Sequence, residues 1–205
     1  MLIAGIRALM LSITVLLWSL GIGMLAFDAQ GQEQKNVSES ANTMTETSAY
    51  PSIPECVQTH IPTARMVGQS RLKMYFFKIY DAILYAPNGQ FDQTQPFALS
   101  LGYLRDFDGA DIAQRSINEM RDLGYRNTAQ LAQWLIQMEL SFPNIIAGDV
   151  LTGVVDEQQH TRFYFNGKPT HTVADPEFTQ AFFAIWLDSK TSQPKMRVQL
   201  LGETK

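Results

Sequence analysis

The stretch that decides the fold is MVGQSRLKMYFFKIYDAILYA, residues 66–86. It is rich in aromatic and β-branched side chains, which favour β-strands. It is also too long for a single ordinary strand, because strands in globular proteins usually hold about 5–6 residues. The sequence therefore predicts two strands joined by a turn near residues 73–76, which together form a hairpin.

The strand pattern continues on the C-terminal side of this stretch. In PFALSLGYL, residues 96–104, large apolar side chains alternate with smaller ones, which predicts a half-buried strand. The side chains expected on one face are Phe97, Leu99, Leu101 and Tyr103. Further strands are expected at residues 150–155 and 162–165, and Asn166-Gly167 favours a tight hairpin turn into a third strand that ends near Val173.

Two regions change to the helical period. Asp108 is a typical N-cap, and Gly124 is a typical helix stop, so a helix is expected between them. A second helix starts near Thr128 and ends before Pro143, and a third starts after Asp175. The final segment, KMRVQLL, alternates again and predicts one more strand. Together these elements predict an α+β fold, a large antiparallel sheet packed by helices on one face.

The chain divides into three expected parts. Residues 8–27 carry no charge, which predicts a signal peptide or a retained membrane anchor within residues 1–29. Residues 30–55 are mostly polar and predict a disordered linker, and residues 56–205 form the folded domain. The protein is therefore expected to be exported to the periplasm or the outer face of the inner membrane. If the N-terminal segment is not cleaved, we expect it to attach the protein to the membrane.

Composition excludes several classes of function. The chain has 205 residues with 16 Lys and Arg against 20 Asp and Glu, so it offers no cationic excess for binding nucleic acid. Its one cysteine, Cys56, excludes an internal disulfide and a multi-thiolate metal site. The three histidines lack ligand spacing, and no phosphate-binding glycine motif is present, so neither a metal nor another cofactor is expected.

Charged residues within apolar strands are the best candidates for a functional site. Arg71, Lys78 and Arg105 lie in such segments, where a charge must find a counter-ion or line a cavity. One interpretation puts them on the solvent face, paired with Asp81, Asp106 or Asp108. The other puts at least one of them in an aromatic cleft, where it binds the anionic head of an apolar ligand. Tyrosine hydroxyls would then be additional donors, from Tyr75, Tyr80, Tyr85 and Tyr103.

Several segments resemble the bacterial chalcone-isomerase-like proteins in order and spacing. They are GQSRLKMYFFKIYDAILYAP, FALSLGYLRD, AGDVLTG, FYFNG, DPEFTQAFFAIWLD and MRVQLLG, within about residues 60–202. The resemblance implies an open-faced β-sandwich with a cleft between sheet and helices. It also implies relatives of two kinds, namely plant isomerases of flavonoid precursors and non-catalytic fatty-acid binders.

The resemblance also suggests site residues. Arg71 matches the cleft arginine of the family, and Tyr80 lies where the plant enzymes have a threonine of the catalytic water network. No residue of the helix IAQRSINEMRDL matches the remaining plant site residues, so flavonoid isomerisation is not the favoured function.

Three functional hypotheses follow. The leading one is a non-catalytic binder of a small amphipathic, fatty-acid-like ligand, with Arg71 as anion anchor, Tyr80 as its partner, and Lys78, Tyr103 and Arg105 nearby. The second is a structural or interaction module of the envelope with a filled interior. The third is an isomerase or lyase that stabilises an enolate with a cation. The sequence leaves the oligomeric state and the ligand's identity open.

Overall fold

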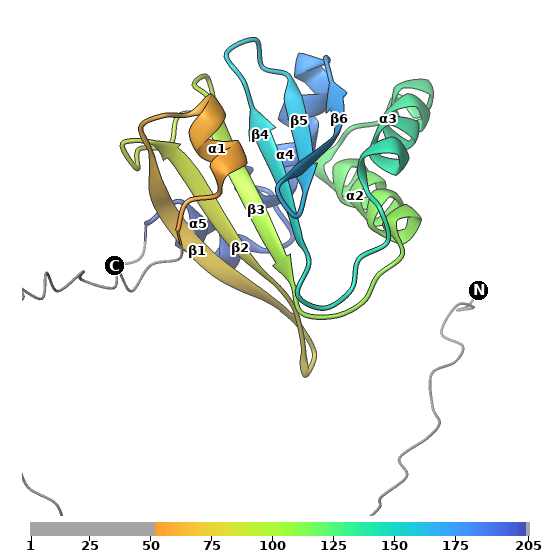
Figure 1. Cartoon of the computed structure of the whole chain (residues 1–205). Coiled ribbons are helices and arrows are strands. Elements are labelled where there is room, and N and C mark those ends of the chain that lie inside the picture. The colour runs from red at the N-terminus through yellow and green to blue at the C-terminus, as the bar shows by residue number, and fades with distance from the viewer. Residues whose placement is uncertain (1–51, 204–205) are drawn as a thin grey trace, which may run out of the picture. The chain divides into compact units, whose positions relative to one another are not determined.

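A computed structural model of the chain describes residues 52–203. Figure 1 shows the arrangement of its helices and strands. In chain order the elements are α1 (Glu55–His60), β1 (Ala64–Met74), β2 (Phe77–Pro87), β3 (Phe97–Tyr103), α2 (Gly109–Leu123), α3 (Thr128–Ser141), β4 (Val150–Val155), β5 (Thr161–Phe165), β6 (Lys168–Val173), α4 (Pro176–Leu187) and α5 (Pro194–Leu200).

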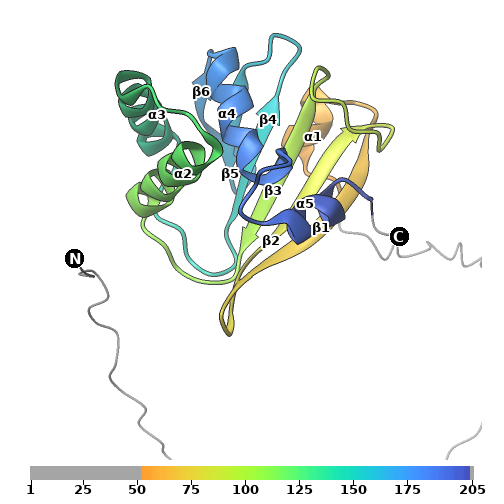
Figure 2. The ribbon, with the colours of Figure 1, turned by 180° about the vertical axis from the view of Figure 1, so that it is seen from behind.

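The centre of the fold is one six-stranded antiparallel sheet whose strands follow each other in sequence order, β1 to β6. Seen from behind, α4 and α5 cross one face of this sheet, with α2 and α3 beside them (Figure 2). Alternation along each strand explains the layering, because residues two apart share a face. The predicted α+β fold, with an antiparallel sheet packed by helices, is confirmed.

The main core lies between the sheet and the helices. Phe97, Leu99 and Leu101 of β3 are buried there against aromatic side chains of α4, which include Phe178 and Phe182. A smaller buried cluster lies on the opposite face, where Cys56 and Val57 of α1 pack over the sheet. The short helix α1 therefore departs from the expectation that all helices cover one face.

The expected last strand is wrong, because residues 194–200 form helix α5. Pro194 occupies the first turn, where a missing N–H costs nothing, and Met196 and Leu200 are buried four residues apart on one side. The helix lies directly on β1. A side chain at Gly68 would collide with backbone oxygens of Gln199 and Leu200, so glycine is what allows the close approach.

The expected turns and caps are present elsewhere. Asn166 and Gly167 have φ angles of 49° and 77°, as the tight hairpin turn between β5 and β6 requires. The Asp175 carboxylate accepts hydrogen bonds from the backbone N–H groups of Glu177 and Phe178, which caps α4.

The described residues, 52–203, lie within one compact unit. Every strand, helix and buried cluster described above lies within it. A chain of about 150 residues buries enough apolar surface to be stable without metal or disulfide. We therefore expect this unit to fold without the residues that precede it.

The predicted signal or anchor, residues 1–29, and most of the predicted linker lie outside the described residues. Among residues 52–203, none of the helices has both the length and the apolar character needed to cross a bilayer.

Candidate functional site

A cavity of about 220 Å³ lies between the helix-covered face of the sheet and helices α2 and α4. Its walls are mainly aliphatic and aromatic, and its few polar groups are two tyrosine hydroxyls from the sheet and side chains of α2 and of the segment before α5. The lining residues from the sheet and its loops are Leu72, Met74, Ile79, Tyr80, Leu101, Tyr103, Phe107, Phe142 and Leu151. Those from α2, α4 and the segment before α5 are Asp111, Ile112, Arg115, Ser116, Glu119, Phe182, Ile185, Trp186, Ser192 and Gln193.

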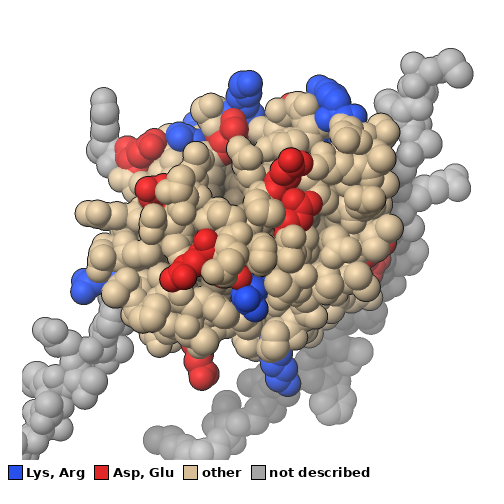
Figure 3. Space-filling view, turned by 90° about the horizontal axis from the view of Figure 1, so that it is seen from above, with Lys and Arg blue, Asp and Glu red and all other residues tan. Residues whose placement is uncertain are grey.

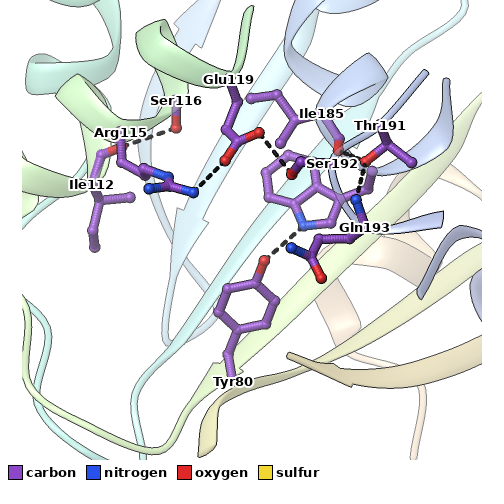
Figure 4. Close-up of polar contacts among 10 residues, drawn as sticks. Tyr80, Ile112, Arg115, Ser116, Glu119, Ile185, Thr191, Ser192 and Gln193 are labelled. Atoms are coloured by element: carbon purple, nitrogen blue, oxygen red, sulfur yellow. Dashed lines mark hydrogen bonds and ion pairs between the residues drawn. The ribbon is translucent and has the colours of Figure 1, made fainter. Parts of the chain in front are cut away.

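Two tyrosines form the polar part of the cavity floor. Tyr80 and Tyr103 are register partners on β2 and β3, and their rings meet edge to face with centroids 5.6 Å apart. The indole N–H of Trp186 donates to the Tyr80 hydroxyl over 2.9 Å and so links α4 to the sheet (Figure 4). The Tyr103 hydroxyl lines the same cavity, and a phenol O–H there can donate to a ligand.

Burial determines the protonation of both phenols. It raises the pKa of Tyr80 to about 12, although the hydrogen bond from Trp186 opposes the shift. Burial also raises the pKa of Tyr103, and the neighbouring Tyr80 adds to that effect. Both hydroxyls therefore stay protonated near neutral pH, where they act as hydrogen-bond donors and not as bases.

The charged groups of the site lie at the cavity's opening. Arg115 on α2 donates from Nη2 to Glu119 Oε1 over 2.5 Å, and the Ser192 hydroxyl donates to the other carboxylate oxygen over 2.8 Å (Figure 4). The Arg115 side chain is 62 % exposed, whereas that of Glu119 is 12 % exposed. Glu119 is thus a fixed bridge between α2 and the segment before α5, while the guanidinium of Arg115 reaches solvent at the rim.

Helical spacing explains how α2 supplies this rim. Ile112, Ser116 and Glu119 recur at intervals of four and three residues, so they lie on the face of α2 that is turned toward the sheet. The Ser116 hydroxyl donates to the Ile112 carbonyl within the helix. This hydroxyl therefore needs no hydrogen-bond acceptor in the cavity.

The expectation that Arg71 points into the cavity is wrong. Its guanidinium donates to the Asp81 carboxylate with both Nε and Nη2, at 2.5 and 2.7 Å. The pair is well exposed, with side chains 40 and 42 % accessible. Leu72, the next residue, lines the cavity, and consecutive strand residues face opposite sides of a sheet. The Arg71 guanidinium instead holds the pKa of Asp81 below its usual range.

Lys78 and Arg105 also lie outside the cavity. Lys78 is exposed at the start of β2, directly opposite Lys73 of β1. Arg105 follows β3 and stacks on the Phe77 ring, with its guanidinium carbon 4.4 Å from the ring centroid. Of the five predicted site residues, the cavity brings together only Tyr80 and Tyr103.

Four residues of the site were not predicted from the sequence, namely Arg115, Glu119, Trp186 and Ser192. Two of them could have been found by their spacing, because Arg115 and Glu119 are separated by one helical turn on an amphipathic helix. Trp186 and Ser192 carried no comparable signal, since a tryptophan in an aromatic helix is ordinary core.

Other parts of the described chain offer less. No group of three metal-ligating side chains comes together among residues 52–203. A second cavity, of about 370 Å³, lies between α4 and the β2–β3 loop, but its polar lining consists of amides, hydroxyls and Asp188 and has no cation. On the face drawn in Figure 3, acidic and basic side chains are scattered among uncharged surface, so no cationic patch forms there.

Fold and cavity together define a class of protein: an antiparallel sheet covered by helices, with an apolar pocket between the two layers. The chain belongs to the chalcone isomerase-like family, whose family model matches residues 54–202. An uncharacterised protein of Haemophilus influenzae is 29 % identical over 140 residues, which is 68 % of each chain.

A solved structure has the same fold. A fatty-acid-binding protein of Arabidopsis thaliana superposes with a TM-score of 0.54 at 10 % identity, over 69 % of this chain and 88 % of that one. At this identity, the likeness establishes the shared architecture.

Proposed function

We propose that the protein binds a small amphipathic, fatty-acid-like ligand and does not transform it. The observation that carries the proposal is the cavity of about 220 Å³, which is lined mainly by apolar side chains and whose charged lining residues, Asp111, Arg115 and Glu119, all come from α2. A pocket of this kind places a tail in the interior and a polar head at the rim. The fatty-acid-binding activity named for the Arabidopsis structure supports the same kind of ligand.

The volume limits the ligand's size. A cavity of 220 Å³ holds roughly seven water volumes at about 30 Å³ each, and drug-sized ligands usually occupy about 300–1,000 Å³. We therefore propose a medium-chain acyl tail, with any longer chain emerging through the opening.

The charged residues that line the cavity determine where the carboxylate head of a ligand would lie. A carboxylate placed deep in the cavity would meet only neutral hydroxyls, and burying an unpaired charge is costly. At the rim, the exposed guanidinium of Arg115 provides a cation. We therefore propose Arg115, in place of Arg71, as the anion anchor, with Glu119 as a competing partner for the same guanidinium.

The protonated state of the tyrosines supports binding over catalysis. A general base must be deprotonated near the working pH, whereas the pKa of Tyr80 is about 12. An open cavity also disfavours the alternative of an interaction module with a filled interior.

Titration calorimetry with octanoate and octanol tests the proposal, because the two probes share a tail and differ in the head. We expect residues 48–205 to bind both, with octanoate tighter by about fivefold, the size of an exposed ion-pair contribution. Arg115→Gln should remove that preference. The matched control is Arg121→Gln on the same helix, whose side chain lies outside the cavity and should change nothing.

The outcomes separate the two parts of the proposal. Equal binding of octanoate and octanol would overturn the acidic head and leave the apolar pocket standing. Binding of neither probe would overturn the ligand-binding function itself.

Export completes the proposal. The uncharged run at residues 8–27 supports delivery to the periplasm or the outer face of the inner membrane. Fractionation of cells that express the full chain tests it, and recovery of the protein in the cytoplasmic fraction would contradict it.

A further inference from the structure

The turn between β1 and β2 presents large apolar side chains to solvent. Tyr75 is 93 % exposed and Phe76 is 99 % exposed, and they are flanked by Met74 at 42 % and Phe77 at 53 %. In Figure 1 this hairpin projects beyond the neighbouring strands of the sheet. Such side chains at the tip of a projecting hairpin gain nothing from the fold itself.

The exposed apolar residues of the described chain concentrate at this end. Leu104 follows β3 and Ile146 precedes β4, so both lie at the same end of the strands as the β1–β2 turn. Away from this end of the sheet, the exposed large apolar side chains of residues 52–203 are Ile136 and Leu140 on α3.

Three features of the tip do not stabilise the isolated domain. The aromatic rings stay in water, and Tyr75 has a φ of 54°, a conformation that hairpin turns usually fill with glycine or asparagine. Lys73 and Lys78 are direct register partners, and like charges opposite each other destabilise a strand pair. A partner that buries the rings and neutralises the lysines would turn two of these features into favourable contributions to binding.

The charge pattern indicates which partner. Residues 73–78 contain two lysines and no carboxylate, and Arg105 adds a third cation over the Phe77 ring. The carboxylates at this end of the sheet belong to the loops that follow β3 and precede β4. There Asp106 accepts from the Ala147 N–H, and Asp149 accepts from the Ile146 N–H and from Asn166. Exposed aromatic rings followed by a layer of cations match the acyl boundary and the anionic headgroups of a bilayer.

We propose that the β1–β2 hairpin tip docks on an anionic phospholipid surface. Tyr75, Phe76 and Phe77 enter the interface, and Lys73, Lys78 and Arg105 contact lipid phosphates. The tip adjoins the cavity through Met74, which is exposed in the hairpin and also lines the cavity wall. Docking would therefore bring the cavity close to a lipid surface, although the proposal does not depend on what the cavity binds.

Vesicle co-sedimentation of residues 48–205 tests this proposal. The vesicles consist of phosphatidylcholine alone, or of phosphatidylcholine with an equal part of phosphatidylglycerol. We expect binding to the anionic vesicles that weakens as salt is added, and weaker binding to the neutral ones.

Matched variants assign the binding to the tip. Tyr75→Ser with Phe76→Ser should weaken binding by about tenfold or more, whereas Ile136→Ser with Leu140→Ser removes two exposed side chains from α3 and should change little. Lys73→Gln with Lys78→Gln should remove the preference for anionic lipid, and Lys190→Gln with Lys195→Gln should preserve it. Thermal unfolding of each variant confirms that the domain is intact.

Three results would overturn the proposal. The first is equal vesicle binding by the wild-type protein and the Tyr75/Phe76 variant, and the second is no binding by the wild type. The third is a dimer in vesicle-free sedimentation equilibrium that the tip variant abolishes while vesicles bind neither protein, because the tip would then be a contact between two copies.

Discussion

The indole N–H of Trp186 donates a hydrogen bond to the Tyr80 hydroxyl over 2.9 Å, which joins helix α4 to strand β2 beside the cavity. Trp186 is buried and Tyr80 is partly buried beside the cavity, so each polar group would lose its protein partner without the other. This contact holds one wall of the cavity at a fixed distance from its floor.

Removal of either partner should therefore destabilise the domain. We expect Tyr80→Phe and Trp186→Phe each to lower the free energy of unfolding by about 1–3 kcal/mol, because a buried polar group loses its partner. The double variant should cost less than the sum, with a coupling of about 1 kcal/mol. Denaturant unfolding of the four proteins measures the cycle, and additive costs would show that the hydrogen bond contributes nothing.

Alkaline pH should weaken the fold through Tyr80. Its folded pKa is raised to about 12 by burial, while an unfolded tyrosine titrates near 10. The native state therefore holds more protons between these values, and stability is lost as pH rises through this window. At pH 11 the loss attributable to Tyr80 is about 1 kcal/mol relative to pH 9. Tyr80→Phe should reduce this loss, and an identical pH dependence in both proteins would contradict the assignment.

The sequence predicted those parts of the fold in which local pattern and tertiary packing agree. The hairpin within residues 66–86 is rich in strand-forming side chains, and α4 has a clear N-terminal cap at Asp175. The strand Phe97–Tyr103 is also where it was expected, although it is buried on both faces and not half-buried, because α1 covers its far side. Helix α5 was missed because Met196, Val198 and Leu200 fit an alternating strand as well as a helix. Only the packing of α5 against Gly68 decides between the two.

The site was harder to predict because it depends on which strand face is inward. On the inner face of β1, the positions before Leu72 are Gly68 and Ser70, small residues that leave room for α5, so this face looks polar in sequence. In the sequence, Arg71 is therefore as good a candidate for the inner face of β1 as its neighbours. Arg115 was not recognised because it flanks the buried side of α2, where an arginine looks like an ordinary solvent-exposed residue.

Low pH should weaken the β4–β5 turn. Burial disfavours the charged form of Asp156, but hydrogen bonds from the His160 N–H, the Arg162 guanidinium and the Gln158 N–H outweigh it and hold the pKa of this carboxyl below its usual value. The stability gained is present above the unfolded pKa, near 4, and is lost as pH falls through the lower folded pKa.

The substitution Asp156→Asn tests this assignment. We expect it to lower the free energy of unfolding by about 1–2 kcal/mol at pH 7, and by less at pH 3, where the wild-type carboxylate is itself becoming protonated. Denaturant unfolding at both pH values measures the difference. An equal cost at the two values would mean that the charge of Asp156 does not stabilise the turn.

Glu119 should compete with an acidic ligand for Arg115. Its carboxylate already accepts from the guanidinium and from Ser192, so an arriving carboxylate must share that cation. Glu119→Gln should therefore tighten octanoate binding by about fivefold and leave octanol binding unchanged. Weaker octanoate binding in this variant would indicate that Glu119 positions Arg115 and does not compete for it.

The most direct measurement compares the small molecules that co-purify with wild-type protein and with a cavity-filled variant, by native mass spectrometry. Ser116→Met places a long thioether chain into the cavity from α2, whereas Gln114→Met places the same chain on the exposed side of that helix. We predict an amphipathic molecule bound to the wild type and to Gln114→Met, and none bound to Ser116→Met. Equal retention by all three proteins, or no bound molecule in the wild type, would contradict the account.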